Sequence, residues 1–179
     1  MTQLLFISGS LRQDSSSTAL LRALEQRIKS VPAVTDVTYA DIGALPHYNA
    51  DRAMNEEIRN LVDAIATADG VVIATPEYNF SIPGVLKNAI DWASRPAYQS
   101  VFKGKPVFVL SVSGGALGGV RAQGHLKYIL NGMLAEVFPW QEIVVPAAPK
   151  KLIEGTFEDQ AVLDFATEGL MAFVSRLNS

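Results

Sequence analysis

Short apolar runs alternate with helical patterns along the whole chain, and this alternation limits the possible folds more than any other feature. The runs at residues 4–7, 71–74, 107–110 and 143–145 are continuously apolar, which is typical of strands covered on both faces. A weaker run at 34–39 predicts one more strand. Between the runs, apolar residues recur every three or four positions, as on one face of a helix. The alternation predicts a parallel sheet with helices on both faces.

Five helical segments are marked by apolar residues that share a face. These residues are Leu20, Leu21, Leu24 and Ile28; Ile58, Leu61, Val62 and Ile65; Val85, Ala89 and Trp92; Leu126, Ile129, Leu130 and Met133; and Leu163, Ala166, Leu170, Phe173 and Leu177. No internal repeat, low-complexity tract or linker interrupts the pattern. Five strands alternating with five helices therefore predict a single domain over residues 1–179.

The order of the strands follows from where the polar loops fall. A hydroxyl-rich loop directly after the first strand favours the flavodoxin-like α/β fold, a three-layer sandwich with a five-stranded parallel sheet in the order 2-1-3-4-5. The six-stranded dinucleotide fold is the less favoured alternative. Ligands of such sheets bind beyond the carboxyl ends of the strands. We therefore expect the loops after the first, third and fourth strands to meet in one site.

The first of these loops has the composition of an anion site. Backbone N–H groups in the first turn of a helix lack partners within the helix and carry partial positive charge, which suits a phosphate. Hydroxyls and one guanidinium surround that turn, from Ser10, Arg12, Ser15, Ser16, Ser17 and Thr18. The loop has neither the Gly-x-Gly-x-x-Gly pattern nor a P-loop Lys-Ser/Thr pair, so a terminal monophosphate fits better than a pyrophosphate. A simple helix-capping loop is the alternative.

The other two loops suit a flat ring. Residues 75–84 contain Pro, Asn and Gly, which hold backbone groups at fixed angles, and Tyr78 or Phe80 could cover one face of a ring. Residues 111–119 carry so little side chain that a ring could lie against their backbone. A rigid turn with a packed aromatic and a flexible surface loop are the alternatives. Because all three loops fall at the same predicted edge, we favour a shared ligand site.

Composition excludes several other classes of protein. The chain is 49% hydrophobic and 18% charged, with a formal net charge of -3, so nothing in its charge favours nucleic acid or an anionic membrane as a partner. It has no cysteine, and its two histidines, His47 and His125, lie far apart, so we expect no metal site. No run is long enough to span a bilayer, and the start lacks a basic segment followed by an apolar signal core. The expected location is the cytoplasm.

Several specific motifs are spread along the chain. They are Gly9-Ser10-Leu11-Arg12, Leu45-Pro46-x-Tyr48-Asn49-x-Asp51, Pro76-Glu77-Tyr78-Asn79, Pro83-Gly84-x-Leu86-Lys87-Asn88-Ala89-Ile90-Asp91-Trp92-x-Ser94-Arg95 and Gly118-Gly119-x-Arg121-Ala122-Gln123. Together they resemble the NADPH-dependent FMN reductase family, which comprises flavodoxin-like quinone, azo and chromate reductases. The resemblance covers most of the chain and is weakest after Val145. It departs from the family at Ser17, where the family often has Asn.

The resemblance implies a bound FMN and NADPH or NADH as co-substrate. Its phosphate would lie on the first loop and its isoalloxazine ring against the other two. The implied cofactor-binding residues are Ser10, Leu11, Arg12, Ser15, Ser16, Ser17, Pro76, Glu77, Tyr78, Asn79, Ser111, Val112, Ser113, Gly114 and Gly115. The family is generally dimeric or tetrameric. Trp92, Arg95 and the segment 121–123 are candidates for subunit contacts, although a large aromatic at a helix end is more often part of the core.

The implied reaction is carried by the flavin rather than by a side chain. NAD(P)H would give a hydride to flavin N5 and leave, and a quinone, azo compound, chromate or free flavin would then take two electrons from the same face, a ping-pong scheme. The sequence offers no Ser-His-Asp set and no carboxylate pair in these loops. Glu77 is expected to be a solvated turn residue rather than a proton donor. The alternatives are a flavodoxin-type electron carrier, usually a more acidic protein, and an FMN-binding redox sensor.

Overall fold

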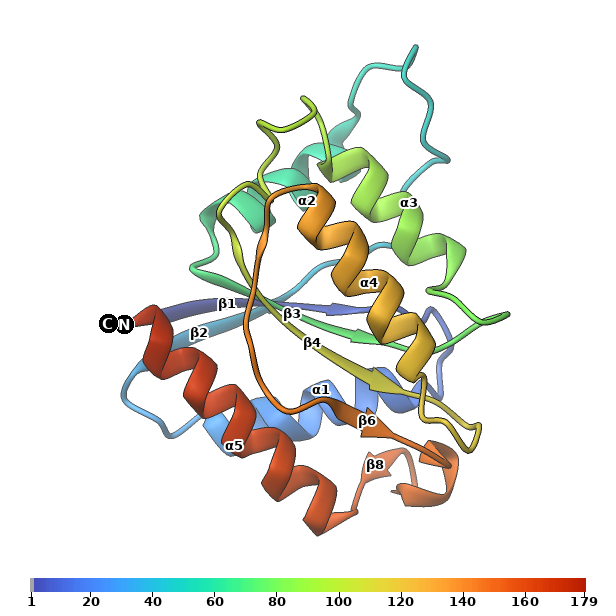
Figure 1. Ribbon diagram of the computed structural model, residues 1–179, viewed down its shortest axis with the longest axis vertical. Coiled ribbons are helices and arrows are strands. Elements are labelled where there is room, and N and C mark those ends of the chain that lie inside the picture. Colours follow the sequence, from blue (N-terminus) through green and yellow to red (C-terminus); the bar gives the residue numbers. More distant parts are fainter. Residues whose placement is uncertain (1) are drawn as a thin grey trace.

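A parallel β-sheet forms the centre of the computed structural model (Figure 1), which describes residues 2–179 apart from the side chain of Thr35. Its strands are β1 (Thr2–Ser8), β2 (Val34–Tyr39), β3 (Gly70–Thr75), β4 (Pro106–Val112), β5 (Glu136–Val137) and β6 (Ile143–Val145). They lie in the order β2-β1-β3-β4-β5, and β6 also pairs with β4. This confirms the predicted flavodoxin-like order.

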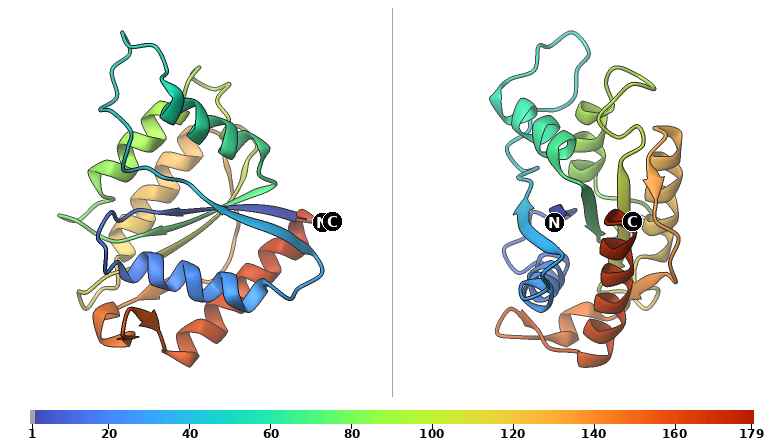
Figure 2. Two further views of the ribbon diagram at one scale, coloured as in Figure 1. Left: turned by 180° about the vertical axis from the view of Figure 1, so that it is seen from behind. Right: turned by 90° about the vertical axis from the view of Figure 1, so that its left-hand side faces the viewer.

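Helices cover both faces of the sheet. One face carries α1 (Ser16–Ile28) and α5 (Gln160–Leu177), and the other carries α2 (Glu56–Thr67), α3 (Gly84–Ala93) and α4 (Val120–Gly132) (Figures 1 and 2). Side chains alternate between the two layers, since Val71 and Ile73 of β3 pack with α2 to α4 whereas Val72 and Ala74 pack with α1 and α5. Because both faces are covered, the central strands are continuously apolar.

The helix starts follow from residues just before each helix. The side chains of Ser15, Asn55 and Asp159 accept hydrogen bonds from backbone N–H groups in the first turns of α1, α2 and α5, as N-cap residues do. In α3 and α4 the flanking residues Pro83 and Gly119 supply no such side-chain bond. The start of α4 therefore needs a partner from elsewhere in the chain.

The fifth position of the sheet differs from the single strand predicted at residues 143–145. Two short strands share it, with β5 beside the amino end of β4 and β6 beside its carboxyl end. Pro139 lies between them and has no N–H for a ladder, while Phe138 and Trp140 pack toward α5. A 3-10 helix, Ala148–Lys151, and a hairpin of β7 (Leu152–Ile153) with β8 (Thr156–Phe157) then lead to α5.

The ends of the chain meet at the edge of the sheet opposite the three loops (Figure 1). The Asn178 side chain donates a hydrogen bond of 2.7 Å to the Thr2 hydroxyl, so α5 ends against the start of β1. Within residues 2–179, no helix combines the length and the apolar character that crossing a membrane requires.

Candidate functional site

The loops that follow β1, β3 and β4 meet at the carboxyl edge of the sheet, because these three strands are neighbours. The first two loops touch at Gly9, whose N–H donates to the Ala74 carbonyl at 2.8 Å. A Cβ atom at Gly9 would lie 3.1 Å from the Pro76 ring and 3.3 Å from the Ala74 carbonyl oxygen. A side chain at Gly9 would therefore push the two loops apart.

The first loop holds unpaired donors at the start of α1. The Ser15 Oγ accepts the Thr18 N–H at 3.2 Å, so this hydroxyl caps the helix as the simpler interpretation expects. Within residues 2–179, however, no group accepts a hydrogen bond from the N–H of Ser16 or Ser17. Two free N–H groups at a helix start are donors for an anion.

The side chains of the first loop differ in how accessible they are. Arg12 is exposed and its guanidinium forms no ion pair with any residue from 2 to 179. Ser10 and Ser15 are buried, and Ser17 is only 2% exposed. Arg12 is therefore the most accessible of these four residues.

The second loop is a tight hairpin turn. Tyr78 and Ser81 exchange two backbone hydrogen bonds of 3.0 and 3.1 Å, and the two residues between them, Asn79 and Phe80, have φ values of 47° and 67°. Positive φ at both central positions defines a type I′ turn, which suits Asn but strains a bulky residue such as Phe. Phe80 is nevertheless 66% exposed, so no burial of its ring offsets the strain.

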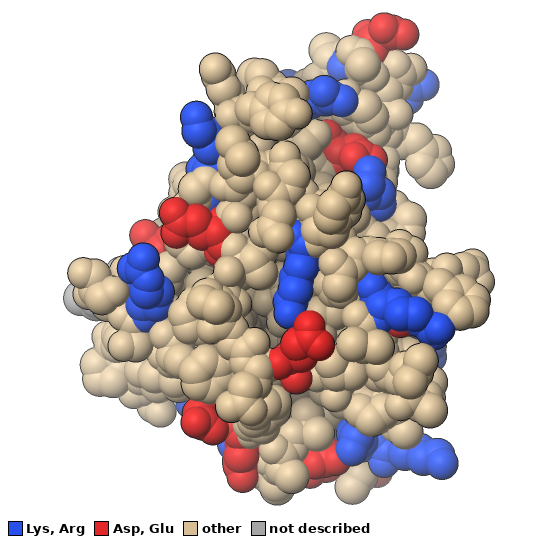
Figure 3. Space-filling view, in the orientation of Figure 1, with Lys and Arg blue, Asp and Glu red and all other residues tan. Residues whose placement is uncertain are grey.

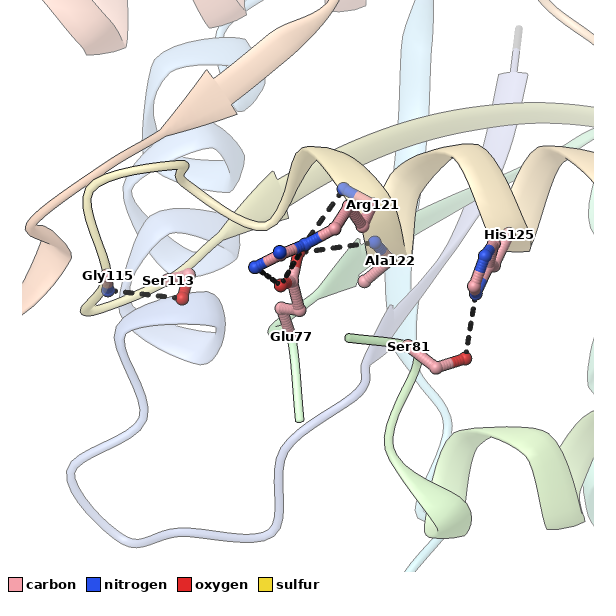
Figure 4. A network of polar contacts seen from close by, with 7 residues as sticks. All are labelled: Glu77, Ser81, Ser113, Gly115, Arg121, Ala122 and His125. Carbon is pink, nitrogen blue, oxygen red and sulfur yellow. Dashed lines mark hydrogen bonds and ion pairs between the residues drawn. The ribbon is translucent and has the colours of Figure 1, made fainter. Parts of the chain in front are cut away.

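Glu77 joins this hairpin to α4 (Figure 4). Its carboxylate accepts hydrogen bonds from the N–H groups of Arg121 and Ala122 at 3.2 and 3.4 Å and from Arg121 Nε at 2.8 Å. These are the N–H groups that α4 leaves without a cap of its own. The expectation that Glu77 is a solvated turn residue is wrong, because its side chain is only 8% exposed.

The charge of Glu77 is stabilised in place. Removal from water opposes ionisation, but the hydrogen bonds from the Arg121 side chain and from the Ala122 N–H outweigh it and hold the pKa of Glu77 below its ordinary value. Glu77 therefore carries a negative charge at neutral pH. Its oxygens are occupied as acceptors, so it is a helix cap and not a free proton donor.

Two side chains on one face of α4 contact the hairpin. The Arg121 guanidinium carbon lies 4.2 Å from the centre of the Phe80 ring, a cation–π contact. One turn further along α4, His125 Nδ1 lies 3.0 Å from the Ser81 hydroxyl (Figure 4). This role was not predicted from the sequence, although the i,i+4 spacing of Arg121 and His125 could have indicated a shared face.

The third loop has a buried base and an exposed tip. The Ser111 hydroxyl donates to the Gln123 side chain at 3.3 Å, and Gln123 donates to the Val109 carbonyl at 3.1 Å. Ser111 and Val112 are buried in β4, so of the predicted ring residues in this loop, Ser113 to Gly115 are the accessible ones. At the tip, the Ser113 Oγ accepts the Gly115 N–H at 3.3 Å.

The glycines of the third loop fall into two pairs. Gly118 and Gly119 have φ values of 59° and 88°, and a Cβ at Gly118 would lie 2.5 Å from the Val144 side chain. The fold itself requires them. Gly114 and Gly115 have no atom closer than 3.6 Å to such a Cβ, so internal packing leaves room for side chains there. Their bare backbone therefore fits a site for a flat ligand.

A further loop, residues 45–49, is bound to α3. The Pro46 carbonyl accepts hydrogen bonds from the side chains of Asn88 and Trp92 at 3.0 and 2.8 Å, and the Tyr48 N–H donates to Asn88 at 2.7 Å. Trp92 is 3% exposed and is a core residue. Arg95 is exposed and donates to the Tyr48 hydroxyl at 2.8 Å.

Charge is spread evenly on the face seen in Figure 3, where basic and acidic side chains are interspersed. No extended patch of one sign is visible on that face. On this face, local donors rather than an extended patch of one sign are available to attract a charged ligand.

Comparison with known proteins agrees with this architecture. The model of the NADPH-dependent FMN reductase family matches residues 2–150. The chain is 41% identical over 178 residues to a quinone reductase of Escherichia coli, covering 96% of this chain and 93% of that protein. It is 45% identical over 149 residues to an NAD(P)H-dependent FMN reductase of Pseudomonas aeruginosa, covering 82% and 78%.

Among solved structures, the flavoenzyme NAD(P)H:(acceptor) oxidoreductase FerB of Paracoccus denitrificans has a TM-score of 0.83 and 33% identity, over 99% of this chain and 98% of that one. Sequence and structure agree over nearly the full length. The chain therefore belongs to the NADPH-dependent FMN reductase family.

Proposed function

We propose that the protein is an FMN-dependent NAD(P)H oxidoreductase that passes electrons to quinones or similar acceptors such as azo compounds, chromate or free flavin. The proposal rests on one observation above all: three loops with the donors and bare backbone that FMN needs meet at one edge of the sheet. The names of the relatives, a quinone reductase and an FMN reductase, support it.

The phosphate of FMN fits the start of α1. The unpaired N–H groups of Ser16 and Ser17 would donate to it, together with hydroxyls of Ser10 and Ser15 and the guanidinium of Arg12, while Leu11 contributes backbone. Each charge-assisted hydrogen bond contributes about 1.5 to 3 kcal/mol, and a micromolar ligand needs about 8 kcal/mol. The first loop alone falls short after ordering costs, so contacts to the ring must add to it.

We infer that the isoalloxazine ring lies between the other two loops. Pro76 to Asn79 would form one wall and the backbone of Ser113 to Gly115 the other, with Ser111 and Val112 as the buried strand end beneath it. Internal packing leaves space for side chains at Gly114 and Gly115, yet the chain has glycine at both positions. This supports the placement of the ring. The hairpin wall is held rigid by Glu77, whose bonds to α4 tie it in place.

When bound, FMN would supply the hydride-transfer chemistry for a ping-pong reaction between NAD(P)H and an acceptor. The residues of this chain bind and orient. Glu77 holds its negative charge against Arg121 and the α4 start, so it neither takes nor gives a proton. Backbone N–H groups of the third loop can stabilise negative charge at the nearby ring edge.

A visible absorption spectrum under anaerobic conditions tests the proposal. The purified protein should show flavin absorbance, and NADPH or NADH alone should bleach it. Steady turnover with a quinone should follow when acceptor is added. A protein that binds FMN but is not bleached by either nicotinamide would be an electron carrier instead, and a bleached protein with no acceptor turnover would be a redox sensor.

As part of this proposal, the chain forms a single domain over residues 1–179. It assembles into a homodimer or homotetramer and is located in the cytoplasm. Exposed side chains near the site, including Tyr78, Phe80 and Leu117, are apolar surface that a partner subunit could cover. Light scattering on the purified protein measures the number of subunits directly.

A further inference from the structure

A hollow lies beside the third loop, at the carboxyl end of β6. Its volume is about 530 Å³, and the 3-10 helix and the β7–β8 hairpin form its walls. The lining residues used below are Pro146, Lys150, Lys151, Ile153, Glu158 and Asp159. The proposed FMN site does not use any of these residues.

The hollow adjoins the loop on which we place the flavin ring. The N–H groups of Ala147 and Ala148 donate to the carbonyls of Gly115 and Ser113 at 3.2 and 3.0 Å. A Cβ at Gly114 would lie 3.6 Å from the Pro149 ring. Ala147, which is bonded to the third loop, also lines the hollow, so the hollow begins directly beside that loop.

Of the two lysines that line this hollow, Lys150 is the one without an ion pair among residues 2–179. Lys151 is paired with Asp159, and Asp159 also caps α5 through the Val162 N–H at 3.1 Å, so these two charges serve the structure. Lys150 is exposed and takes part in no ion pair with another residue from 2 to 179. The remaining charge that lines the hollow is the carboxylate of Glu158, which opposes it.

The lining suits one end of a nucleotide. Ile153 is 65% exposed and, with Pro146, offers apolar surface for a base, while the Lys150 ammonium suits a phosphate monoester. Resting on the proposed function, we propose that this hollow binds the adenosine 2′-phosphate end of NADPH and that Lys150 determines the preference for NADPH over NADH. Glu158 limits that preference, because its charge repels the same phosphate.

Steady-state kinetics test the assignment through the ratio of kcat/KM for NADPH to that for NADH. Lys150→Gln should lower the ratio about two- to five-fold, the upper part of the range for an exposed ion pair, and Glu158→Gln should raise it. The wild-type ratio should fall as salt is added, because exposed charges are screened. Lys103→Gln is the matched control, an exposed lysine just before β4, and should leave the ratio unchanged.

Direct binding separates this inference from the proposed function. Calorimetry on the FMN-saturated protein should show tighter binding of adenosine 2′,5′-bisphosphate than of adenosine 5′-monophosphate, and Lys150→Gln should remove the difference. If neither nicotinamide bleaches the flavin, the proposed function fails while the calorimetry still decides about the hollow.

Two results would overturn the assignment. In the first, Lys150→Gln changes neither the kcat/KM ratio for NADPH to NADH nor the difference in affinity between the two adenosine phosphates. In the second, Arg22→Gln abolishes the NADPH preference and the affinity difference instead. Arg22 lines the hollows of about 380 and 570 Å³ beside α1, and such a result would place the 2′-phosphate there.

Discussion

Arg12 and the first turn of α1 carry the proposed phosphate site at the level of single residues. Arg12→Ala should weaken FMN binding about ten-fold or more, since a hydrogen bond to a charged group contributes about 1.5 to 3 kcal/mol. The melting temperature of the FMN-free protein should not change, because Arg12 is exposed. Fluorescence titration with FMN measures the affinity.

Arg176→Ala serves as the control for this variant. Arg176 lies in the last turn of α5, close to the chain ends. Its removal should leave FMN affinity as it is. Equal affinities in wild-type protein and Arg12→Ala would contradict the placement of the phosphate.

Gly118 and Gly115 provide a matched pair in one loop. Gly118→Ala should destabilise the fold by more than about 1 kcal/mol, because its positive φ and the Val144 contact both reject a side chain. Gly115→Ala should fold normally, since the nearest atom to the new Cβ is 3.8 Å away, yet it should weaken FMN binding. Thermal unfolding and FMN titration of both variants separate the two effects.

Some residue roles could be predicted from the sequence, and others could not. Arg12 and the serines of the first loop could be singled out because a helix start and its anion donors are neighbours in the chain. Glu77 could not be assigned its role, because the N–H groups it caps lie 44 and 45 positions away. Only the folded sheet brings them together.

At the level of elements, α4 depends on Glu77 for its N-terminal cap. Glu77→Gln should lower the free energy of unfolding near neutral pH by about 0.5 to 2 kcal/mol, the usual contribution of a cap. The pKa of Glu77 is lower in the folded protein, so its contribution is present above the ordinary value of 4.5 and is lost as pH falls through the folded pKa.

The lowered pKa of Glu77 predicts a measurable difference in how stability depends on pH. In urea unfolding from about pH 6 down to about pH 3, the stability of Glu77→Gln should fall less steeply than that of the wild type. Glu136→Gln, at an exposed position in β5, is the control and should follow the wild-type curve. Parallel curves for Glu77→Gln and wild type would mean that Glu77 does not cap α4.

Elements with a strong periodic pattern could be predicted from the sequence, and short ones could not. The strands β1, β3 and β4 are buried on both faces, which forces long apolar runs. The strands β5, β7 and β8 have two residues each, too few for any period to show. Their positions depend on tertiary contacts, such as those of Phe138 and Trp140 with α5.

At the level of the whole molecule, FMN should act as part of the folded structure. A ligand that binds only the native state at 100 times its dissociation constant adds about 2.7 kcal/mol. For a chain of this size this corresponds to a rise in melting temperature of roughly 5 to 10 °C. Calorimetry with and without FMN measures it.

Riboflavin, which lacks the phosphate, is the matched ligand for this experiment. It should raise the melting temperature less than FMN does. In Arg12→Ala the two ligands should differ less than they do in the wild type. Equal shifts by both ligands in the wild type would show that the first loop does not bind the phosphate.

The strand order was predictable because a polar loop after the first of five strands is typical of one arrangement. How subunits associate was not, since exposed apolar side chains such as Phe80 are compatible with a bound ring or with a partner chain.

The divided fifth position of the sheet also affects how the protein behaves at high concentration. A long, regular outer strand is a template on which other chains can add and aggregate. Here Pro139 and the break between β5 and β6 leave no continuous ladder along that side, and at the opposite side β2 carries the exposed Asp36. Both margins thus resist strand addition, which should keep the protein dispersed even before its cofactor is bound.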